Sequence, residues 1–285
     1  MSQVEDIILD RDKRGVSHLR GYLSPDFCHD AARFLLEHAP RALICTGFYI
    51  KRAKAPETDG PPGAYFIGKA LQALGFQVTY VSDRHSIGLF RGLARPHELI
   101  EFPIADVATS RRFAQDVLSR LTPTVVISIE RCSLTARGRY LNMLGVDITP
   151  FNARLDYLVE GQPATIGIGD GGNEIGMGNL AAQIPSVATL PKEPAATTVS
   201  KLVLASVSNW GGYGLITALS LQARRNLLPS VETETDLIRF MVSRGAVDGI
   251  MTQRVHAVDG FLLEENQKTL ERLHALLSAQ GLRTG

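Results

Sequence analysis

Residues 164–179, ATIGIGDGGNEIGMGN, join a short apolar run to a loop that is rich in glycine. An uninterrupted apolar run of this length is typical of a strand buried on both faces of a parallel sheet. Similar runs lie at 42–47, 77–83, 98–104, 124–130 and 201–208. Segments between them, such as 63–75, 110–121 and 212–226, have apolar residues at helical spacing. This alternation predicts an α/β fold, doubly wound, with a mainly parallel sheet flanked by helices.

Both ends of the chain are predicted to be helical. Residues 4–15 and 24–39 precede the first strand, and Ser24 is the expected N-cap of the second helix, with Pro25 at its first position. Residues 235–245 and 260–280 form a final helical pair. We expect one α/β domain over 1–285, in which 1–40 are a helical extension and 41–285 the catalytic core.

The composition narrows the classes of partner. The net charge is +1, so no strong field attracts nucleic acid or an anionic membrane surface. No apolar run approaches the roughly 18 residues that span a bilayer, and the first residues do not resemble a secretory signal. Three scattered cysteines form no disulfide pattern. These features predict a cytoplasmic protein with no nucleic-acid or membrane partner, and they are compatible with a homo-oligomer.

Polar side chains follow five of the predicted strands, at the edge where parallel sheets bind ligands. They include Lys51, Glu57, Asp59, Asp83, Arg84, His85, Glu130, Arg131, Asn142, Asp147, Asp170, Asn173, Glu174 and Asn209. Any one of the acids alone is as well explained by a helix cap or a turn. Several carboxylates at one edge, however, raise one another's pKa unless a cation binds them. Mg²⁺ and Mn²⁺ prefer oxygen ligands and would stabilise such a cluster.

The glycine-rich loop fits a nucleotide-phosphate site poorly. A phosphate loop of the Walker type ends in Gly-Lys-Ser/Thr, and residues 165–179 contain no lysine. Asp170 would also repel a pyrophosphate group. We therefore interpret the loop as a means of turning Asp170, Asn173 and Glu174 toward one point. A second glycine turn, NWGGYG at 209–214, precedes a helix whose first N–H groups are expected to bind a carboxylate or a phosphate.

Several blocks of the sequence resemble the D-glutamate cyclase family, namely the C-terminal domain of the mitochondrial enzyme and its stand-alone prokaryotic relatives. The blocks are ETDGPPGA (57–64), IER (129–131), NMLGVDIT (142–149), GIGDGGNEIGMGN (167–179), SNWGGYG (208–214) and VDG (258–260). The resemblance implies an α/β fold and the conversion of D-glutamate to 5-oxo-D-proline with loss of water, assisted by Mn²⁺ or Mg²⁺.

Roles for individual residues follow from this resemblance and from the strand ends together. The expected metal ligands are Asp59, Asp147, Asp170 and Glu174. The expected catalytic residues are Glu130, Asp170 and Glu174, with Glu130 taking the ammonium proton. The expected substrate-binding residues are Arg131, Asn173, Asn209, Gly211 and Gly212. Glu130 and Arg131 are equally compatible with a surface ion pair or a helix cap.

Two other functions use the same residues. One is a Mg²⁺- or Mn²⁺-dependent phosphohydrolase that acts on a small phosphate ester, because clustered acids around such a cation also bind phosphoryl oxygens. The other is a non-catalytic protein that binds an acidic metabolite.

Overall fold

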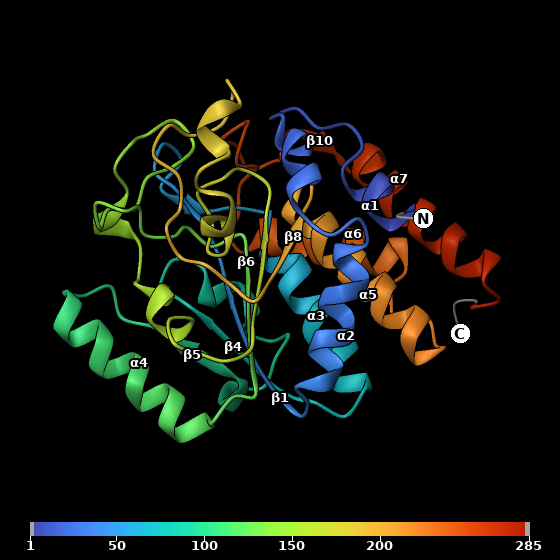
Figure 1. Ribbon diagram of the computed structural model, residues 1–285, viewed down its shortest axis with the longest axis horizontal. Helices are drawn as coiled ribbons and strands as arrows, with labels where there is room; N and C mark the ends of the chain where they lie inside the picture. The colour runs from blue at the N-terminus through green and yellow to red at the C-terminus, as the bar shows by residue number, and fades with distance from the viewer. Residues whose placement is uncertain (1–2, 283–285) are drawn as a thin grey trace.

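The computed structural model describes residues 3–282, and its centre is one six-stranded sheet (Figure 1). The strand order is β5–β4–β1–β6–β7–β8, and every neighbouring pair is parallel. The strands are β1 (Arg41–Thr46), β4 (Gln77–Ser82), β5 (Leu99–Glu101), β6 (Val125–Ile129), β7 (Thr165–Gly169) and β8 (Lys201–Leu204). Each corresponds to one of the predicted apolar runs, so the predicted doubly wound α/β fold is confirmed.

The order of the strands defines where a ligand is expected to bind. From β1 the chain moves outward to β4 and β5, and it then returns to the other side of β1 to form β6, β7 and β8. The direction of winding therefore reverses between β1 and β6. In open parallel sheets the crevice beyond this reversal, at the carboxyl ends of the strands, is the usual ligand site.

Helices cover both faces of the sheet and produce two apolar cores. The α-helices are α1 (Gln3–Ile8), α2 (Phe27–Glu37), α3 (Pro61–Ala73), α4 (Val107–Leu121), α5 (Ser208–Ala223), α6 (Val231–Ser243) and α7 (Leu263–Ala279). Helices α2, α3 and α5 pack on one face, and α4 lies on the other (Figure 1). Neighbouring residues of a strand point to opposite faces of the sheet. In β1, Ile44 therefore lies in the larger core and Leu43 in the smaller one.

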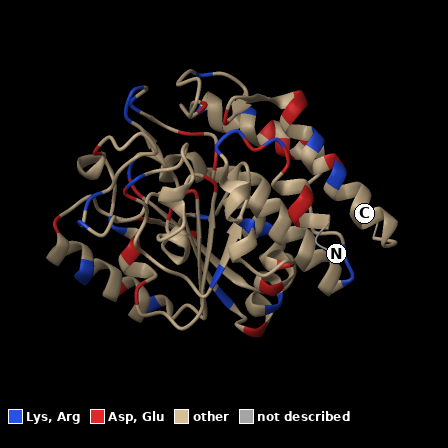
Figure 2. Ribbon diagram, turned by 45° about the horizontal axis from the view of Figure 1, so that its top comes forward, with Lys and Arg blue, Asp and Glu red and all other residues tan. Residues whose placement is uncertain are grey.

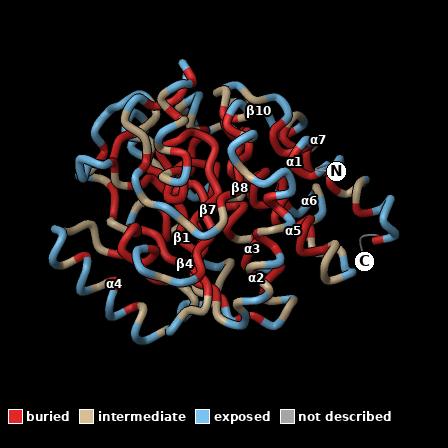
Figure 3. The backbone as a smooth tube through the Cα atoms, in the orientation of Figure 1, coloured by how far each residue is buried: buried red, intermediate tan, exposed pale blue. Residues whose placement is uncertain are grey.

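Burial and charge are distributed as expected for such a layered fold. Buried backbone is concentrated in the strands and in α5, whereas much of α4 is exposed (Figure 3). Acidic and basic residues are interspersed over the outer helices and loops (Figure 2). No helix in the described part of the chain is both long and apolar enough to cross a membrane.

Short elements complete the connections. Two antiparallel hairpins are formed by β2 (Tyr49–Ile50) with β3 (Ala55–Pro56), and by β9 (Ala257–Val258) with β10 (Phe261–Leu262). The 3₁₀ turns are η1 (Val16–Tyr22), η2 (Ile87–Phe90), η3 (Pro96–Glu98), η4 (Thr149–Phe151), η5 (Leu155–Leu158), η6 (Met177–Leu180) and η7 (Ile184–Ser186). Strand β5 is shorter than predicted because it pairs only with β4 and because Pro103, two residues beyond its end, has no N–H to extend the ladder.

The N-terminal region differs from its prediction in two places. Helix α1 ends at Ile8, because the Asp12 carboxylate accepts backbone N–H groups in a tight turn that competes with a helix. Helix α2 begins at Phe27, so the predicted N-cap at Ser24 is wrong. Near its start, the N–H of Cys28 donates to Glu5 Oε1 at 2.8 Å, so a buried residue of α1 supplies the partner. Both α1 and α2 pack against α5 in the larger core.

Candidate active site

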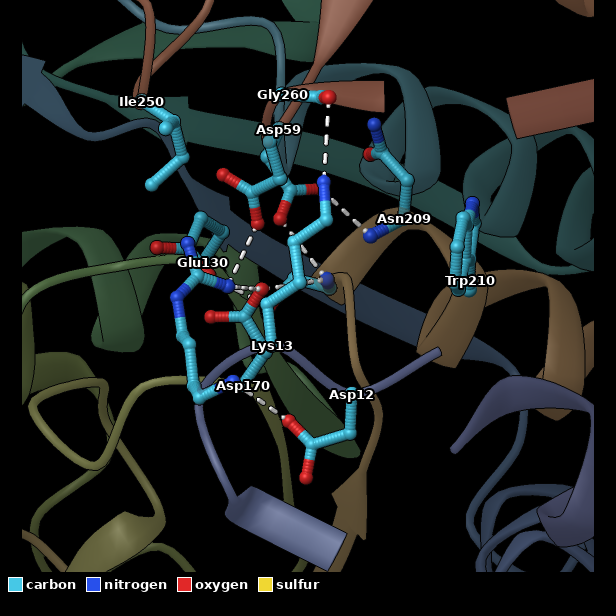
Figure 4. A network of polar contacts seen from close by, with 12 residues as sticks. Asp12, Lys13, Asp59, Glu130, Asp170, Asn209, Trp210, Ile250 and Gly260 are labelled. Carbon is cyan, nitrogen blue, oxygen red and sulfur yellow. Dashed lines mark hydrogen bonds and ion pairs between the residues drawn. The ribbon is translucent and has the colours of Figure 1, made fainter. Parts of the chain in front are cut away.

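The carboxyl ends of β1, β6 and β7 bring three carboxylates together. The chain leaves β1 through the β2–β3 hairpin and then reaches Asp59, whereas Glu130 and Asp170 directly follow β6 and β7. One carboxylate oxygen from each of the three lies within 4.8 Å of the other two, and all three residues are buried. Figure 4 shows these side chains close together. Asp59, Glu130 and Asp170 are between 40 and 111 positions apart in the sequence, and the parallel strands bring them to one point.

Asp59 is fixed by the first turn of α5. The N–H of Asn209 donates to Asp59 Oδ1 at 2.7 Å, and the N–H of Ser208 donates to Oδ2 at 2.9 Å. The same Ser208 N–H also lies 3.2 Å from Asp170 Oδ2. A helix N-terminus attracts anions because its first N–H groups are unpaired and its dipole is positive there. The sequence predicts an anion at this turn, and the anion is the protein's own carboxylate.

Asn209, Gly211 and Gly212 are structural in this arrangement, which differs from their predicted role in substrate binding. Asn209 Oδ1 accepts the N–H groups of Gly60 and Gly63, and its Nδ2 donates to Thr58 O, so three of the four hydrogen bonds that this buried side chain can make are to the protein backbone. A Cβ on Gly211 would lie 2.6 Å from Ile168 Cγ2. A Cβ on Gly212 would lie 3.3 Å from the Cα of Gly63. Both glycines allow α5 to approach the sheet and α3.

Glu130 has an uncommon backbone conformation that requires a glycine beside it. Its φ of 42° is in the left-handed region, which costs roughly 1 to 2 kcal/mol for a residue with a Cβ. Gly60 faces it with a φ of 91°, and a Cβ on Gly60 would lie 2.5 Å from the Cβ of Glu130. The hydroxyl of Ser208 donates to Glu130 Oε2 at 2.5 Å. These contacts orient the Glu130 carboxylate toward Asp59 and Asp170.

The glycine-rich loop turns Glu174 back toward the strand that precedes it. Glu174 Oε2 accepts the N–H of Gly172 at 2.8 Å, and Gly172 has a φ of 91°. A Cβ on Gly171 would lie 2.7 Å from Glu174 Oε1, so the loop closes around this carboxylate without room for a side chain. Asn173 Nδ2 donates to Leu141 O at 3.2 Å, while its buried Oδ1 has no partner in the described part of the structure. The loop thus presents acidic and amide oxygens.

Two charged residues of the site come from opposite ends of the chain. Arg14 Nη1 lies 2.6 Å from Asp170 Oδ2 and 2.7 Å from Asp259 Oδ2. Arg14 belongs to the turn before η1, and Asp259 lies between β9 and β10 with a φ of 52°. Lys13 Nζ donates to Gly260 O in the same region (Figure 4). The guanidinium group bridges the glycine-rich loop and the C-terminal hairpin.

Burial and mutual repulsion shift the pKa values of these acids. Burial, with a further contribution from Asp259, raises the pKa of Asp59 to about 7. Burial and the nearby Glu174 and Glu57 carboxylates raise the pKa of Glu130 well above its ordinary value. Burial likewise raises the pKa values of Glu57, Asp170 and Glu174. Burial opposes ionisation of Asp259, but the charge and hydrogen bond of Arg14, together with hydrogen bonds from the Asp170 and Asp59 carboxyl groups, outweigh it and lower the pKa of Asp259.

A cavity of about 450 Å³ opens onto this cluster. Its acidic lining consists of Glu57, Glu130, Asp170, Glu174 and Asp259. Its basic lining consists of Lys13, Arg14, Lys51 and Arg52, of which all but Arg14 are exposed. Apolar residues such as Phe48, Met143 and Phe261 form much of the remaining wall. The acids therefore lie deep in the cavity, and most of the cations stand at its mouth.

Unpartnered polar atoms around the cavity indicate a ligand of polar character. Glu57 Oε1, Asn173 Oδ1 and Ser206 Oγ are buried and have no hydrogen-bond partner among the described residues. Leaving such groups unpaired costs roughly 1 to 3 kcal/mol each. Buried carboxylates that repel one another, with neutral oxygens beside them, are the donor set that a hard divalent cation prefers. The residues present therefore fit Mg²⁺ or Mn²⁺.

Comparison with known proteins places the chain in a family. A family model described as "D-glutamate cyclase-like, C-terminal" matches residues 4–274. This chain belongs to that D-glutamate cyclase-like family. It is 28% identical over 304 aligned positions to human "D-glutamate cyclase, mitochondrial", an alignment that covers 89% of this chain and 48% of the human protein. The chain thus spans about half the length of that relative.

In this member of the family, two further predicted site residues, Arg131 and Asp147, lie outside the cluster. Arg131 Nη1 forms a buried ion pair with Asp83 at 2.7 Å and donates to Gly47 O, while Nη2 donates to Ala153 O. These contacts hold it away from the cavity, so it does not fit the predicted role of a substrate ligand. Asp147 is exposed, and its Oδ1 accepts the N–H of Thr149, which is a turn cap rather than a metal ligand.

The residues that sequence reasoning missed are Arg14, Asp259 and Glu57. Asp259 falls in the VDG block, which contributes to the family resemblance but does not indicate what Asp259 does. Glu57 follows the first strand, but its position in the sequence does not distinguish it from the other acids at the strand ends. Arg14 stands in the charged segment DRDKRG, where nothing distinguishes it from its neighbours, because only the folded chain shows which cation reaches the acids.

Proposed function

We propose that this chain converts D-glutamate to 5-oxo-D-proline and water, with a divalent cation, Mn²⁺ or Mg²⁺, as cofactor. The observation that carries the proposal is the convergence of Asp59, Glu130 and Asp170 on one point beside a cavity of suitable size. Membership of the D-glutamate cyclase-like family supports the same chemistry. The polarity of the cavity supports it as well, since a small amino dicarboxylate carries charges of both signs.

Asp59, Glu130 and Asp170 would hold the cation. When bound, the cation would neutralise the γ-carboxylate of the substrate and make its carbon a better electrophile. The sequence alone favours proton transfer as the role of Glu130. We assign it instead to the ligand set, because one of its oxygens faces Asp59 and Asp170 and Oε2 accepts the Ser208 hydroxyl.

Glu174 is the proposed proton carrier. It lines the cavity, and burial raises its pKa, which makes its carboxylate a stronger base. Its Oε2 accepts the N–H of Gly172, which leaves Oε1 to take a proton from the substrate ammonium group. The amine nitrogen then forms a bond to the γ-carbon. One γ-carboxylate oxygen leaves as water with two protons that came from the ammonium group, and Glu174 Oε1 delivers them in turn.

The test is a product analysis with matched variants. The purified chain is incubated with Mn²⁺ or Mg²⁺ and with D-glutamate, L-glutamate or 5-oxo-D-proline, and the products are separated by chiral chromatography. We expect 5-oxo-D-proline from D-glutamate, and a loss of about 100-fold or more in kcat for Glu174→Gln. Asp170→Asn is expected to weaken Mn²⁺ binding in calorimetry, whereas Asp147→Asn, an exposed acid outside the cluster, serves as the control.

A fourth substrate separates the other functions. Release of phosphate from p-nitrophenyl phosphate without formation of 5-oxoproline would replace the proposal by a metal-dependent phosphohydrolase. Binding of D-glutamate with no product of either kind would favour a protein that binds an acidic metabolite. Unchanged Mn²⁺ affinity in Asp170→Asn would contradict the ligand assignment.

A further inference from the structure

Arg14 is held in the site by its backbone as well as by its side chain. Asp12 Oδ1 accepts the N–H groups of Arg14 and Gly15 at 2.9 and 2.8 Å, and Asp12 Oδ2 accepts the N–H of Ser17 at 2.8 Å. The hydroxyl of Thr189 donates to Arg14 O. This turn fixes the backbone position from which the Arg14 side chain reaches the cavity that it lines. A ligand-binding group benefits from such preorganisation, because little conformational entropy remains to be lost.

Only one nitrogen of the Arg14 guanidinium group is occupied by the protein, as far as the described residues extend. Nη1 contacts both Asp170 Oδ2 and Asp259 Oδ2. Within residues 3–282, Nε and Nη2 have no hydrogen-bond or ion-pair partner. A guanidinium group has five N–H donors in a planar fork that suits a carboxylate. Arg14 lines the cavity, so the unoccupied edge of this fork is available to a ligand there.

Arg14 is also the cation best placed to act on a bound anion. Its side chain is 15% exposed, whereas Lys13, Lys51 and Arg52 are exposed residues at the mouth. Lys13 is engaged by Gly260 O and the Phe261 ring, and Lys51 donates to Asp147 O. Attraction between charges is stronger and less screened by salt where water is excluded. Among the described residues, a carboxylate deep in this acidic cavity therefore has one suitable partner.

We propose that Arg14 binds the α-carboxylate of the substrate through Nε and Nη2 and thereby makes the site selective for α-amino dicarboxylates. This inference rests on the proposed function, in which the γ-carboxylate is directed to the cation that Asp59, Glu130 and Asp170 would hold. With the two carboxylates held apart in this way, the ammonium group lies between them and within the acidic part of the cavity. An amine that lacks the α-carboxylate, such as 4-aminobutyrate, would not use Arg14.

The test compares Arg14→Lys with Arg11→Lys, the same substitution at an exposed arginine of the same segment that pairs with Glu265. Lysine keeps a positive charge near Asp170 and Asp259 but loses the fork. For Arg14→Lys we expect KM for D-glutamate to rise about 10- to 100-fold, with a smaller change in kcat. Turnover of 4-aminobutyrate should be unaffected by the substitution, so discrimination between the two substrates falls. Arg11→Lys should resemble the parent in every measurement.

Calorimetry separates the possible failures. Mn²⁺ affinity and the melting temperature of Arg14→Lys are expected to stay close to those of the parent, which shows that the fold and metal site are intact. If the Mn²⁺-loaded parent binds D-glutamate without converting it, the proposed function fails, but weaker binding by Arg14→Lys still supports the role of Arg14. An unchanged KM, or an unchanged affinity for D-glutamate, overturns the inference. Absence of any D-glutamate binding by the parent overturns both.

Discussion

Gly60 is the residue on which the position of Glu130 most directly depends. It has a φ of 91°, and a Cβ at this position would lie only 2.5 Å from the Glu130 Cβ, which leaves no room for a side chain. We expect Gly60→Ala to lower the free energy of unfolding by about 1 to 3 kcal/mol and to weaken Mn²⁺ binding, because Glu130 must move. Denaturant unfolding and calorimetry measure the two effects.

Gly75 offers a matched control for this substitution. It has a φ of 88°, but a Cβ there would meet no atom of residues 3–282 within 4 Å. Gly75→Ala therefore introduces the backbone strain alone, roughly 1 kcal/mol, and should leave Mn²⁺ binding unchanged. If the two variants had the same Mn²⁺ affinity, the contact between Gly60 and Glu130 would not control the proposed metal site.

Asn209 is expected to matter for stability more than for substrate affinity. Its side chain pairs with the N–H groups of Gly60 and Gly63 and with Thr58 O, all of which are buried. Asn209→Ala leaves these groups unpaired, so we expect a loss of about 2 to 4 kcal/mol in the free energy of unfolding. Denaturant unfolding measures this loss. A large rise in KM without a loss of stability would restore the substrate-binding role predicted from sequence.

At the scale of elements, the approach of α5 to β7 depends on Gly211. Alanine normally stabilises a helix relative to glycine by about 1 kcal/mol. At Gly211 the added Cβ would lie 2.6 Å from Ile168 Cγ2, so we expect Gly211→Ala to destabilise the protein by about 1 to 3 kcal/mol. Gly21→Ala is the control in the same unfolding experiment, because an added Cβ there would meet no atom of the described residues within 4 Å. If Gly211→Ala were more stable than the parent, α5 would be able to move away from the sheet at little cost.

A buried acid in the helical layer gives a second prediction at this scale. Glu234 on α6 accepts hydrogen bonds at Oε1 from Tyr213 of α5 and Asn266 of α7. Burial raises its pKa from 4.5 to about 7. The folded state therefore holds this proton more tightly than the unfolded state, and the associated stability is lost as the pH rises through about 7. Glu234→Gln should match the parent near pH 4, below the unfolded pKa of 4.5, and melt at least about 2 °C higher near pH 8.5.

Thermal denaturation at the two pH values checks this difference. The glutamine keeps an oxygen for Tyr213 and Asn266 and removes the charge that appears at high pH. A parent and a variant with parallel melting curves at both pH values would mean that Glu234 titrates normally in the folded protein.

At the scale of the whole molecule, the acid cluster should make the metal-free protein sensitive to alkaline pH. The pKa of Asp59 rises from 3.8 to about 7, so its stabilising contribution is complete below about pH 4 and is lost as the pH rises through 7. The pKa values of Glu57, Glu130, Asp170 and Glu174 shift in the same direction. The pKa of Asp259 is lowered, so its contribution to stability increases with pH, but it is one residue against the five acids whose pKa values are raised.

We therefore expect a lower melting temperature near pH 8 than near pH 5.5 in the presence of a chelator. Mn²⁺ in place of the chelator should raise the melting temperature most at the higher pH, because binding to the folded state stabilises it and the carboxylates are then ionised. A chelated protein that melts higher near pH 8 would contradict the pKa shifts of the cluster. Mg²⁺ in a third series tests which cation is preferred.

The sheet and the acidic core of the site could be predicted because each depends on local sequence. Buried parallel strands are apolar throughout, and their carboxyl ends share one edge, so Asp59, Glu130 and Asp170 are expected to converge. Arg131 could not be placed in the same way. It follows Glu130 directly, but the two side chains take opposite directions, and Arg131 pairs with Asp83.

Arg14 and Asp259 were beyond prediction for a different physical reason. Each sits in a turn, and its place in the site follows from contacts between distant segments and not from periodicity. The sequence predicted that the first N–H groups of α5 bind an anion, and they do bind a carboxylate, but the sequence did not show that Asp59 supplies it. Local patterns thus predict which chemical groups gather at the sheet edge, whereas long-range packing decides which of them face the cavity.

The bridge from Arg14 to Asp259 has a consequence for how the protein assembles. These residues are 245 positions apart, so their contact closes nearly the whole chain into one loop. Contacts between distant segments form slowly, because the entropy of loop closure must be overcome before they contribute. A chain emerging from the ribosome would complete all six strands while its acids still lacked Asp259 and the final position of Arg14. We expect the acidic pocket to be among the last parts to become ordered, so that competence to bind metal reports complete folding.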